Sequence, residues 1–429
     1  MKTVESLQKA GNFFVFLSLL LFSISIPTSI ALDNFAAGFG ILGFLLLFLF
    51  EKKVLLPPLT PVFSLFFPES VSALLNRIGI TKTDLNQHLT PYFVSYRTLL
   101  LSYESFWKFV NLLILSSTVS VFVVIFEAFS WQNVKHLNIK NLSFHLLPVR
   151  AEGLLNHPLT TAGVFYILLV LFVFLSFRFK KVKYYLAAFL LLVGIIFTQS
   201  RSYWLGSSLF IVLVVIFYLR GFKRLLASVL LLSAFLSLLF VPPLKSRLES
   251  ISNLKNNWSN LDRIILWTSH IKAFKNDYSL KEKIFGTGEQ AWKYSWHRFP
   301  ESFKEITGKP YPKLNRKLPP SKWPHFHGGL THNIYLKYLT KYGLLGLLGY
   351  LLFWGYILFV NFKAPTRTFR LFSFGYIGFL FAGFFENNFT DAEVQFAVWF
   401  VLGINFALLN LKKAYKTTFS ESSPDNEPL

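Results

Sequence analysis

Long apolar segments alternate with short basic or polar connections along almost the whole chain. A helix that crosses a bilayer needs about 20 mainly apolar residues, and about twelve runs approach or reach that length. They cover residues 11–31, 34–50, 54–68, 91–105, 108–129, 160–178, 183–200, 203–219, 224–241, 333–361, 369–386 and 393–411. The pattern predicts an all-α polytopic membrane protein with about twelve transmembrane helices.

The connections between these runs carry clusters of Lys and Arg that predict how the chain is oriented. The clusters lie at residues 51–53, 178–183, 220–224, 363–370 and 412–416. If the N-terminus is cytoplasmic, every cluster falls on the cytoplasmic side, as the positive-inside rule expects. This holds only if the short runs 54–68 and 91–105 both cross the membrane, or neither does.

The spacing of the runs divides the chain into four parts. Residues 1–241 hold helices one to nine, 242–332 form a large outer loop, 333–411 hold helices ten to twelve, and 412–429 form a cytoplasmic tail. Helical periodicity inside the loop, at residues 261–274, predicts that it is partly helical.

Composition supports a membrane protein and limits the partners. The chain is 53% hydrophobic, has a net charge of +22 and contains no cysteine. Such a charge on a soluble protein would favour nucleic acid. Here the cytoplasmic clusters explain much of it, so no nucleic-acid partner is expected. The outer loop is also basic, which fits either an anionic partner or contact with anionic lipid head groups.

Two arginines lie at the outer ends of predicted helices. Arg201 follows Ser200 where one run ends and the next begins, and Arg150 precedes the run that starts near residue 160. An arginine at this depth either reaches up into the lipid head groups or faces a polar cavity with a function. Both interpretations stay open for Arg201.

A third arginine lies on the predicted helix of the outer loop. Arg263 and Trp267 are four residues apart in the segment 261–274, so they share a face. An amphipathic helix lying on the membrane surface would explain this pattern without chemistry. The alternative is that the Arg263 guanidinium binds phosphate oxygens in a bidentate manner.

Histidines precede the long run that starts at residue 333. His325, His327 and His332 could form part of a zinc site, although this spacing is a weak signal. His332, next to Asn333 at the edge of the membrane, is better suited to act as a general base.

Two further polar segments are candidates for supporting roles. Gly286 and Gly288 flank a threonine and could offer backbone N–H groups to an anion, although a plain tight turn is the simpler interpretation. Glu386 lies with Asp391 and Glu393 in a short outer turn, where these carboxylates are either acid–base groups or solvated.

Taken in order, these segments resemble the O-antigen ligase and polymerase superfamily of bacterial envelope glycosyltransferases. The resemblance covers roughly residues 140–410. It rests on Arg150, Gly153, Asn156 and Pro158, on Thr198, Ser200 and Arg201, on Arg263 and Trp267, on Gly286 and Gly288, and on His332, Asn333, Gly343 and Gly346. Each motif is weak alone, but five in the family's order are fairly specific.

The resemblance implies a fold, a reaction and a location. Members have a GT-C-like fold in the bacterial inner membrane and move a glycan from undecaprenyl diphosphate at the periplasmic face. Ligases attach the glycan to lipid A–core oligosaccharide, whereas polymerases attach it to another carrier-linked repeat. The ligases resemble metal-independent, inverting enzymes, so no cofactor or metal is expected. The large basic loop favours the ligase, and the polymerase is the alternative.

The resemblance also implies roles for the candidate residues. His332 would be the general base, and Arg201, Arg263 and Arg150 would bind the diphosphate. Supporting residues would be Ser200, Asn333, Trp267, Gly286, Gly288 and Glu386. A transporter is less favoured, because the chain has no internal repeat and its polar residues lie at the outer ends of the runs.

Overall fold

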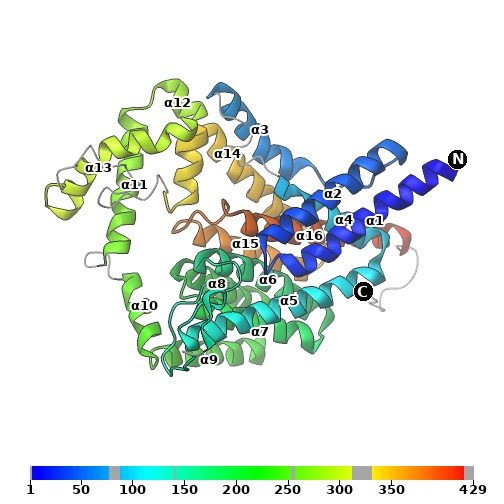
Figure 1. The fold of residues 1–429 in the computed structure, drawn as a ribbon, viewed down its shortest axis with the longest axis horizontal. Coiled ribbons are helices and arrows are strands. Elements are labelled where there is room, and N and C mark those ends of the chain that lie inside the picture. The colour runs from blue at the N-terminus through cyan, green and yellow to red at the C-terminus, as the bar shows by residue number, and fades with distance from the viewer. Residues whose placement is uncertain (1, 77–86, 140–141, 253–256, 312–330, 420–429) are drawn as a thin grey trace.

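The computed structural model describes residues 2–76, 87–139, 142–252, 257–311 and 331–419. Within these ranges the chain forms helices and no strand. The N-terminal ends of α1 and α5 lie on one side of the molecule, and α10 to α13 lie on the opposite side (Figure 1).

Each of the apolar runs forms a helix in the structure. These helices are α1 (Lys2–Ser25), α2 (Ile30–Phe50), α3 (Thr60–Leu75), α4 (Thr90–Leu101), α5 (Tyr103–Ser130), α6 (Pro158–Phe179), α7 (Val182–Phe197), α8 (Arg201–Leu213), α9 (Gly221–Leu238), α14 (Ile334–Phe362), α15 (Arg370–Ala382) and α16 (Ala392–Phe419). A π-helical turn, Val214–Tyr218, continues α8.

Fewer helices are long enough to span a bilayer than the sequence predicts. Among the described residues, 7 helices have the length and hydropathy of a membrane span. The apolar helices α3 and α7 are shorter, and α4 and α15 contain only 12 and 13 residues. The chain is therefore a multi-pass all-α membrane protein, but the expected twelve spans are not confirmed.

The centre of the bundle is formed by helices that are apolar on all sides. The apolar windows of α6 and α16 are 89% and 83% buried, because other helices surround them. By contrast, α2 and α9 expose large side chains such as Phe35, Leu49 and Phe222. In a membrane protein such side chains face lipid rather than water.

The large loop forms a helical subdomain beside the bundle. It contains α10 (Pro242–Ser252), α11 (Trp258–Asn276), α12 (Leu280–Phe285) and α13 (Ala291–Thr307). Ile265 and Leu266 of α11 pack against Phe299 and Phe303 of α13 in a small separate core. An apolar face of α11 is thus covered by protein, which argues against the membrane-surface interpretation of that helix.

A close backbone crossing joins this subdomain to α14. Gly343 has φ +74° and interrupts the helical geometry of α14. A Cβ atom on Gly343 would lie 2.3 Å from Ile284 O, and one on Gly286 would lie 2.2 Å from Lys341 O. Both positions therefore require glycine, for backbone conformation and for space.

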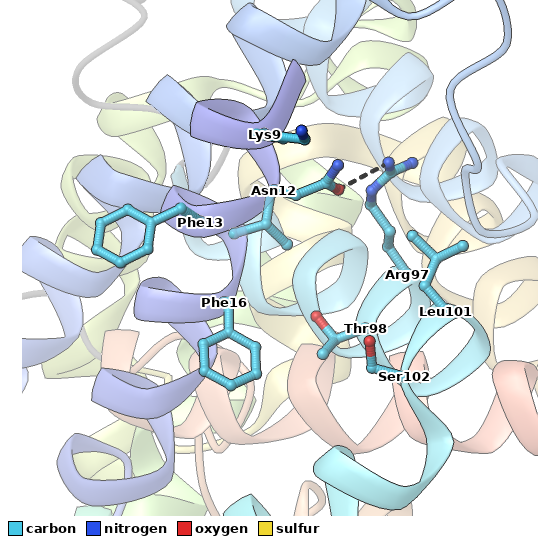
Figure 2. Close-up of a pocket in the computed structure, with 9 residues that line it drawn as sticks. Lys9, Asn12, Phe13, Phe16, Arg97, Thr98, Leu101 and Ser102 are labelled. Atoms are coloured by element: carbon cyan, nitrogen blue, oxygen red, sulfur yellow. Dashed lines mark hydrogen bonds between the residues drawn. The ribbon is translucent and has the colours of Figure 1, made fainter. Parts of the chain in front are cut away.

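A buried ion pair lies at the end of the bundle away from the loop subdomain. Arg97 of α4 bonds Glu51 Oε2 at 2.8 Å and Asn12 Oδ1 at 3.0 Å, beside a cavity of about 460 Å³ (Figure 2). Pairing offsets part of the cost of burying the guanidinium, whose Nε and Nη1 have no hydrogen-bond partner among the described residues. This contact explains how a charged residue is accommodated in the short apolar run 91–105.

Candidate active site

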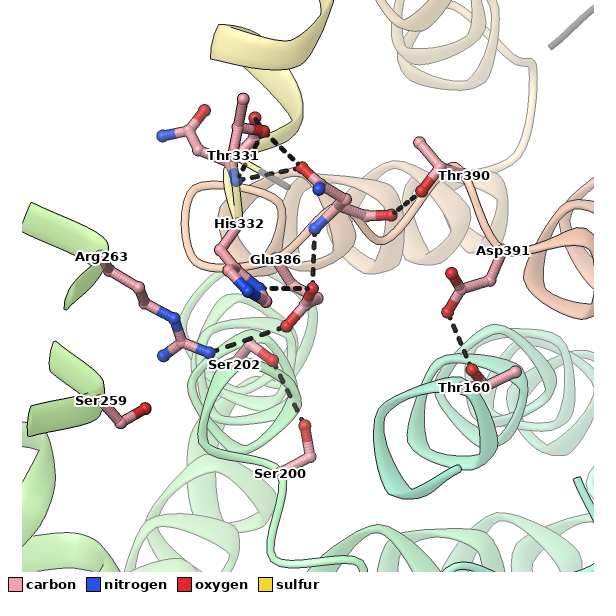
Figure 3. A network of polar contacts seen from close by, with 12 residues as sticks. Thr160, Ser200, Ser202, Ser259, Arg263, Thr331, His332, Glu386, Thr390 and Asp391 are labelled. Carbon is pink, nitrogen blue, oxygen red and sulfur yellow. Dashed lines mark hydrogen bonds and ion pairs between the residues drawn. The ribbon is translucent and has the colours of Figure 1, made fainter. Parts of the chain in front are cut away.

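Four elements bring polar side chains together at the end of the bundle that carries the loop subdomain. Arg201 begins α8, and Arg263 lies in the second turn of α11. His332 precedes Asn333, the N-cap of α14, and Glu386 follows α15. Figure 3 shows Arg263, His332 and Glu386 close together. Each of these side chains lies near the start or the end of a helix, so the topology of the bundle gathers them.

Glu386 is the centre of this group. Its Oε1 lies 3.3 Å from His332 Nδ1, and its Oε2 lies 3.7 Å from Arg263 Nη2. Burial raises the pKa of the Glu386 carboxyl, but His332, Arg263 and the Asn387 N–H together hold that pKa below its usual value. Glu386 is therefore an anion that connects the histidine to a guanidinium.

His332 has an unusual backbone conformation. Its φ is +46°, in the left-handed region that costs non-glycine residues energy. Asn387 Oδ1 compensates by accepting hydrogen bonds from Thr331 Oγ1 at 2.8 Å and from Asn333 N at 3.1 Å. Strained residues held in this way cluster at functional sites, so the geometry supports a functional role for His332.

Two of the supporting candidates hold the backbone around His332. Asn333 is the N-cap of α14, and its side chain accepts a hydrogen bond from Leu336 N at 3.0 Å. Trp267 Nε1 donates to Thr331 O at 2.9 Å, which ties α11 to the residue before the histidine. Both residues fix the position of His332 rather than its chemistry.

Arg201 connects α8 to the loop subdomain. Its Nη1 donates to Ser250 Oγ at 3.0 Å, and its Nη2 donates to Ser259 Oγ at 3.1 Å. Ser200, also a supporting candidate, is buried and lies within hydrogen-bond distance of Ser202 Oγ, at 3.3 Å. Among the described residues no carboxylate forms an ion pair with Arg201, so its charge is not neutralised by a direct partner.

Arg150 lies on the other side of the group. Its Nε donates to Thr198 O at 3.3 Å, at the end of α7. Burial lowers the pKa of Arg150, the charge of Arg247 lowers it further, and Glu386 partly opposes this. Arg150 therefore interacts electrostatically with both Arg247 and Glu386.

A cavity of about 220 Å³ separates α8 from α11. Arg201 and Arg263 supply its charged wall, and Trp267 and Phe385 supply an aromatic wall. Its other lining residues are Ser202, Leu205, Ile251, Asn260 and Ile264. The cavity combines two cations with an apolar surface, which suits an anionic head group attached to a hydrocarbon chain.

Sequence reasoning missed two residues of this region. Arg247 of α10 donates from Nε to Gln199 Oε1 at 3.3 Å and adds a further cation. Asn387 holds the backbone on both sides of His332, as described above. The available signals were an arginine near the start of the loop, Arg247, and the Glu-Asn-Asn run at 386–388.

In the Phe-Gly-Thr-Gly turn at residues 285–288, the N–H groups of Gly286 and Thr287 already donate to backbone carbonyls. Gly286 N donates to Glu282 O at 2.7 Å, and Thr287 N donates to Thr340 O at 3.2 Å. Gly286 packs against Lys341 and Gly343 in the N-terminal half of α14, and Gly288 begins a short 3-10 helix. The structure therefore favours the interpretation of this segment as a tight turn. His325 and His327 lie outside the described residues.

The fold and the site define a class: a multi-pass all-α membrane protein with a cationic, histidine-containing site at one end of its bundle. The family model described as O-Antigen ligase matches residues 186–351. This range includes Arg201, Arg263 and His332. This match confirms the resemblance of the chain to the O-antigen ligase superfamily.

Members of this family are glycosyltransferase-like enzymes of lipopolysaccharide assembly, and the family implies lipid-linked glycan substrates. Arg150 and Glu386 lie outside the matched range but contribute to the same site. A search of curated proteins finds no match.

Proposed function

We propose that the protein is an O-antigen ligase. It transfers a glycan from undecaprenyl diphosphate to lipid A–core oligosaccharide at the periplasmic face of the bacterial inner membrane. The observation that carries this proposal is the contact of Glu386 with both His332 and Arg263, beside a cavity with cationic and apolar walls. A GT-C-like fold remains part of the prediction.

His332 has the right surroundings for a general base. If Nδ1–H donates to the Glu386 carboxylate, the other ring nitrogen, Nε2, is the acceptor of the neutral imidazole. Glu386 then orients the ring and stabilises the imidazolium that forms when Nε2 takes a proton. The same division of roles between histidine and carboxylate operates in hydrolytic triads.

The proposed reaction is a single displacement. The acceptor hydroxyl oxygen forms a bond to the anomeric carbon of the donor while its proton passes to His332 Nε2. The bond between that carbon and the phosphate oxygen breaks, and undecaprenyl diphosphate leaves with the electron pair. Attack from the side opposite the leaving group inverts the anomeric carbon.

The arginines supply the positive charge that the leaving group requires. Arg201 and Arg263 line the same cavity, and Arg150 lies within electrostatic range of Arg263. Guanidinium groups bind phosphate oxygens in pairs and stabilise the charge that develops on them. Because Arg263 contacts Glu386 only at 3.7 Å, a diphosphate can attract this guanidinium without breaking a short hydrogen bond.

Reconstitution in nanodiscs tests this function. Purified protein receives carrier-linked glycan with lipid A–core, or carrier-linked glycan alone, in the presence of EDTA, and the products are identified by mass. Glycan joined to lipid A–core supports the ligase and metal independence. Longer carrier-linked glycan with an unchanged core would establish the alternative, an O-antigen polymerase.

A matched pair of variants assigns the base. His332→Ala is expected to lower turnover by about 100- to 1000-fold while donor binding persists. His297→Ala, on the exposed side of α13, is the control and should behave like the wild type. Equal turnover in both variants would disprove the role of His332.

A further inference from the structure

A second cavity lies beside Arg150, between the residues that follow α5 and those that precede α6. Its volume is about 430 Å³, within the range of small-molecule binding sites. Arg150, Glu152 and Asn156 line it on one side, and the segment 131–136 lines it on the other. We infer that this cavity binds a sugar residue of the glycan substrate. The inference rests on the proposed function.

Trp131 gives the cavity a fixed aromatic surface. It follows the last residue of α5 with φ +58°, and its Nε1 donates to Leu147 O at 2.9 Å. Its ring stacks on His145, with 3.9 Å between centroids and 17° between planes. More than half of Trp131, 52%, is nevertheless exposed. The C–H face of a sugar ring packs well on such an immobilised aromatic surface.

The polar groups around Trp131 suit a ligand with many hydroxyls. Asn133 Nδ2 donates to Glu152 Oε2 at 3.0 Å, so an amide and a carboxylate lie together where the two sides of the cavity meet. Lys135 and His136 add donors at the rim, whereas the carboxylates add acceptors. This mixture of donors and acceptors differs from the cationic cavity at Arg201 and fits a neutral sugar better than a bare phosphate.

Glu127 holds the two walls of the cavity together. Its buried carboxylate accepts hydrogen bonds from Val134 N at 3.0 Å, from Glu152 N at 3.0 Å and from Gly153 N at 2.7 Å. One side chain thereby joins the segment that carries Trp131 to the segment that carries Arg150. The cavity is consequently formed before a ligand arrives, which favours binding.

The position of the cavity relates the sugar to the diphosphate. Arg150 lines the cavity and also lies within electrostatic range of Glu386 and Arg263. A sugar bound there would lie beside Arg150, which interacts electrostatically with groups of the proposed active site. It can belong either to the donor glycan or to the acceptor core, because both present the same ring chemistry.

Binding of lipid-free oligosaccharides tests the inference without turnover. The probes are the core oligosaccharide released from lipid A and the repeat-unit oligosaccharide released from its carrier, each titrated into detergent-solubilised protein and followed by saturation-transfer NMR. We expect the wild type to bind at least one probe. Trp131→Leu should weaken binding about tenfold, whereas Trp131→Tyr, which keeps a flat ring, should retain most of it.

The probe that responds identifies the source of the sugar. If Trp131→Leu loses binding of the core oligosaccharide, the cavity belongs to the acceptor. If it loses binding of the repeat-unit oligosaccharide, the cavity belongs to the donor. If neither probe binds, or if both variants bind like the wild type, the inference is wrong. Should Trp131→Leu lower the melting temperature, His136→Ala at the exposed rim tests the same cavity and is expected to weaken binding several-fold.

The outcome is separable from that of the proposed reaction. Trp131-dependent binding by a protein that transfers no glycan would support the sugar site and disprove the ligase. If the protein transfers glycan but the KM values for donor and acceptor do not change in Trp131→Leu, the ligase is supported and the sugar site is disproved.

Discussion

Replacing Glu386 with glutamine removes one negative charge from the proposed site and preserves the shape of the side chain. Glu386 contacts both His332, the proposed base, and Arg263, a proposed diphosphate ligand. The two roles predict different kinetic effects. Loss of support for the histidine lowers kcat, whereas loss of a competing anion beside Arg263 leaves donor binding unchanged or stronger.

The structure sets the size of the effect on kcat. The carboxylate lies 3.3 Å from the imidazole, and two unit charges about 4 Å apart interact by about 4 kcal/mol near a protein surface. The glutamine can still accept a hydrogen bond from Nδ1, so we expect a loss of about 3 kcal/mol from stabilisation of the imidazolium. At about 1.36 kcal/mol for each tenfold change, kcat should fall roughly 150-fold.

The assay measures kcat and KM for the carrier-linked donor, with lipid A–core in excess, and melting temperature in the same detergent. Glu289→Gln is the matched control, since Glu289 pairs with Lys341 at 3.0 Å away from the site. A higher donor KM with unchanged kcat would refute the assignment of Glu386 as the partner of the base. A fall in melting temperature matching the fall in activity would show a purely structural role.

Three other substitutions, and the acid stability of Glu386→Gln, test separate parts of the structure. Arg263→Lys should raise the donor KM about tenfold in steady-state assays, because an ammonium cannot replace the two-pronged guanidinium. Gly343→Ala should destabilise the fold by about 2–3 kcal/mol, seen as a lower melting temperature, because its φ of +74° and the nearby Ile284 O exclude a Cβ atom. Glu127→Ala should lower kcat/KM about tenfold in the transfer assay by loosening the segment that carries Arg150. The pKa of Glu386 lies below its usual value, so the ionised carboxylate stabilises the folded protein fully above about pH 4.5. This contribution is lost as the pH falls through the lowered pKa. The melting temperature should therefore decline less steeply in acid for Glu386→Gln than for the wild type.

The helices of the bundle were predictable because each depends on local composition. Each apolar run formed a helix close to its expected position, including α6 and α16. The number of spans was harder to predict, because hydropathy does not reveal that α4 ends at Leu101 and α15 at Ala382.

The candidate residues were predictable, but their pairings were not. Polar residues at the ends of apolar runs are costly in a membrane, and this cost drew attention to Arg201 and His332. Nothing in the spacing indicates that Glu386, 54 residues after His332, would contact it at 3.3 Å. The turn at residues 285–288 shows the converse, because two N–H groups of this motif, those of Gly286 and Thr287, donate to backbone carbonyls.

The charges of the site also explain why a diphosphate suits it better than a single carboxylate does. Arg150, Arg201, Arg247 and Arg263 interact electrostatically, and Glu386 is the carboxylate that pairs with one of them at the site. Partly buried cations that repel one another destabilise a protein unless an anion joins them. Glu386 cannot satisfy all of them, because its two oxygens already face His332 and Arg263. A lipid diphosphate brings several acceptor oxygens to the cavity between Arg201 and Arg263, so its binding relieves repulsion that the folded chain leaves in place. In the proposed reaction, the product still carries that diphosphate after the glycan has moved. We therefore expect the charges that promote departure of the leaving group also to bind it tightly, so that product release is slow.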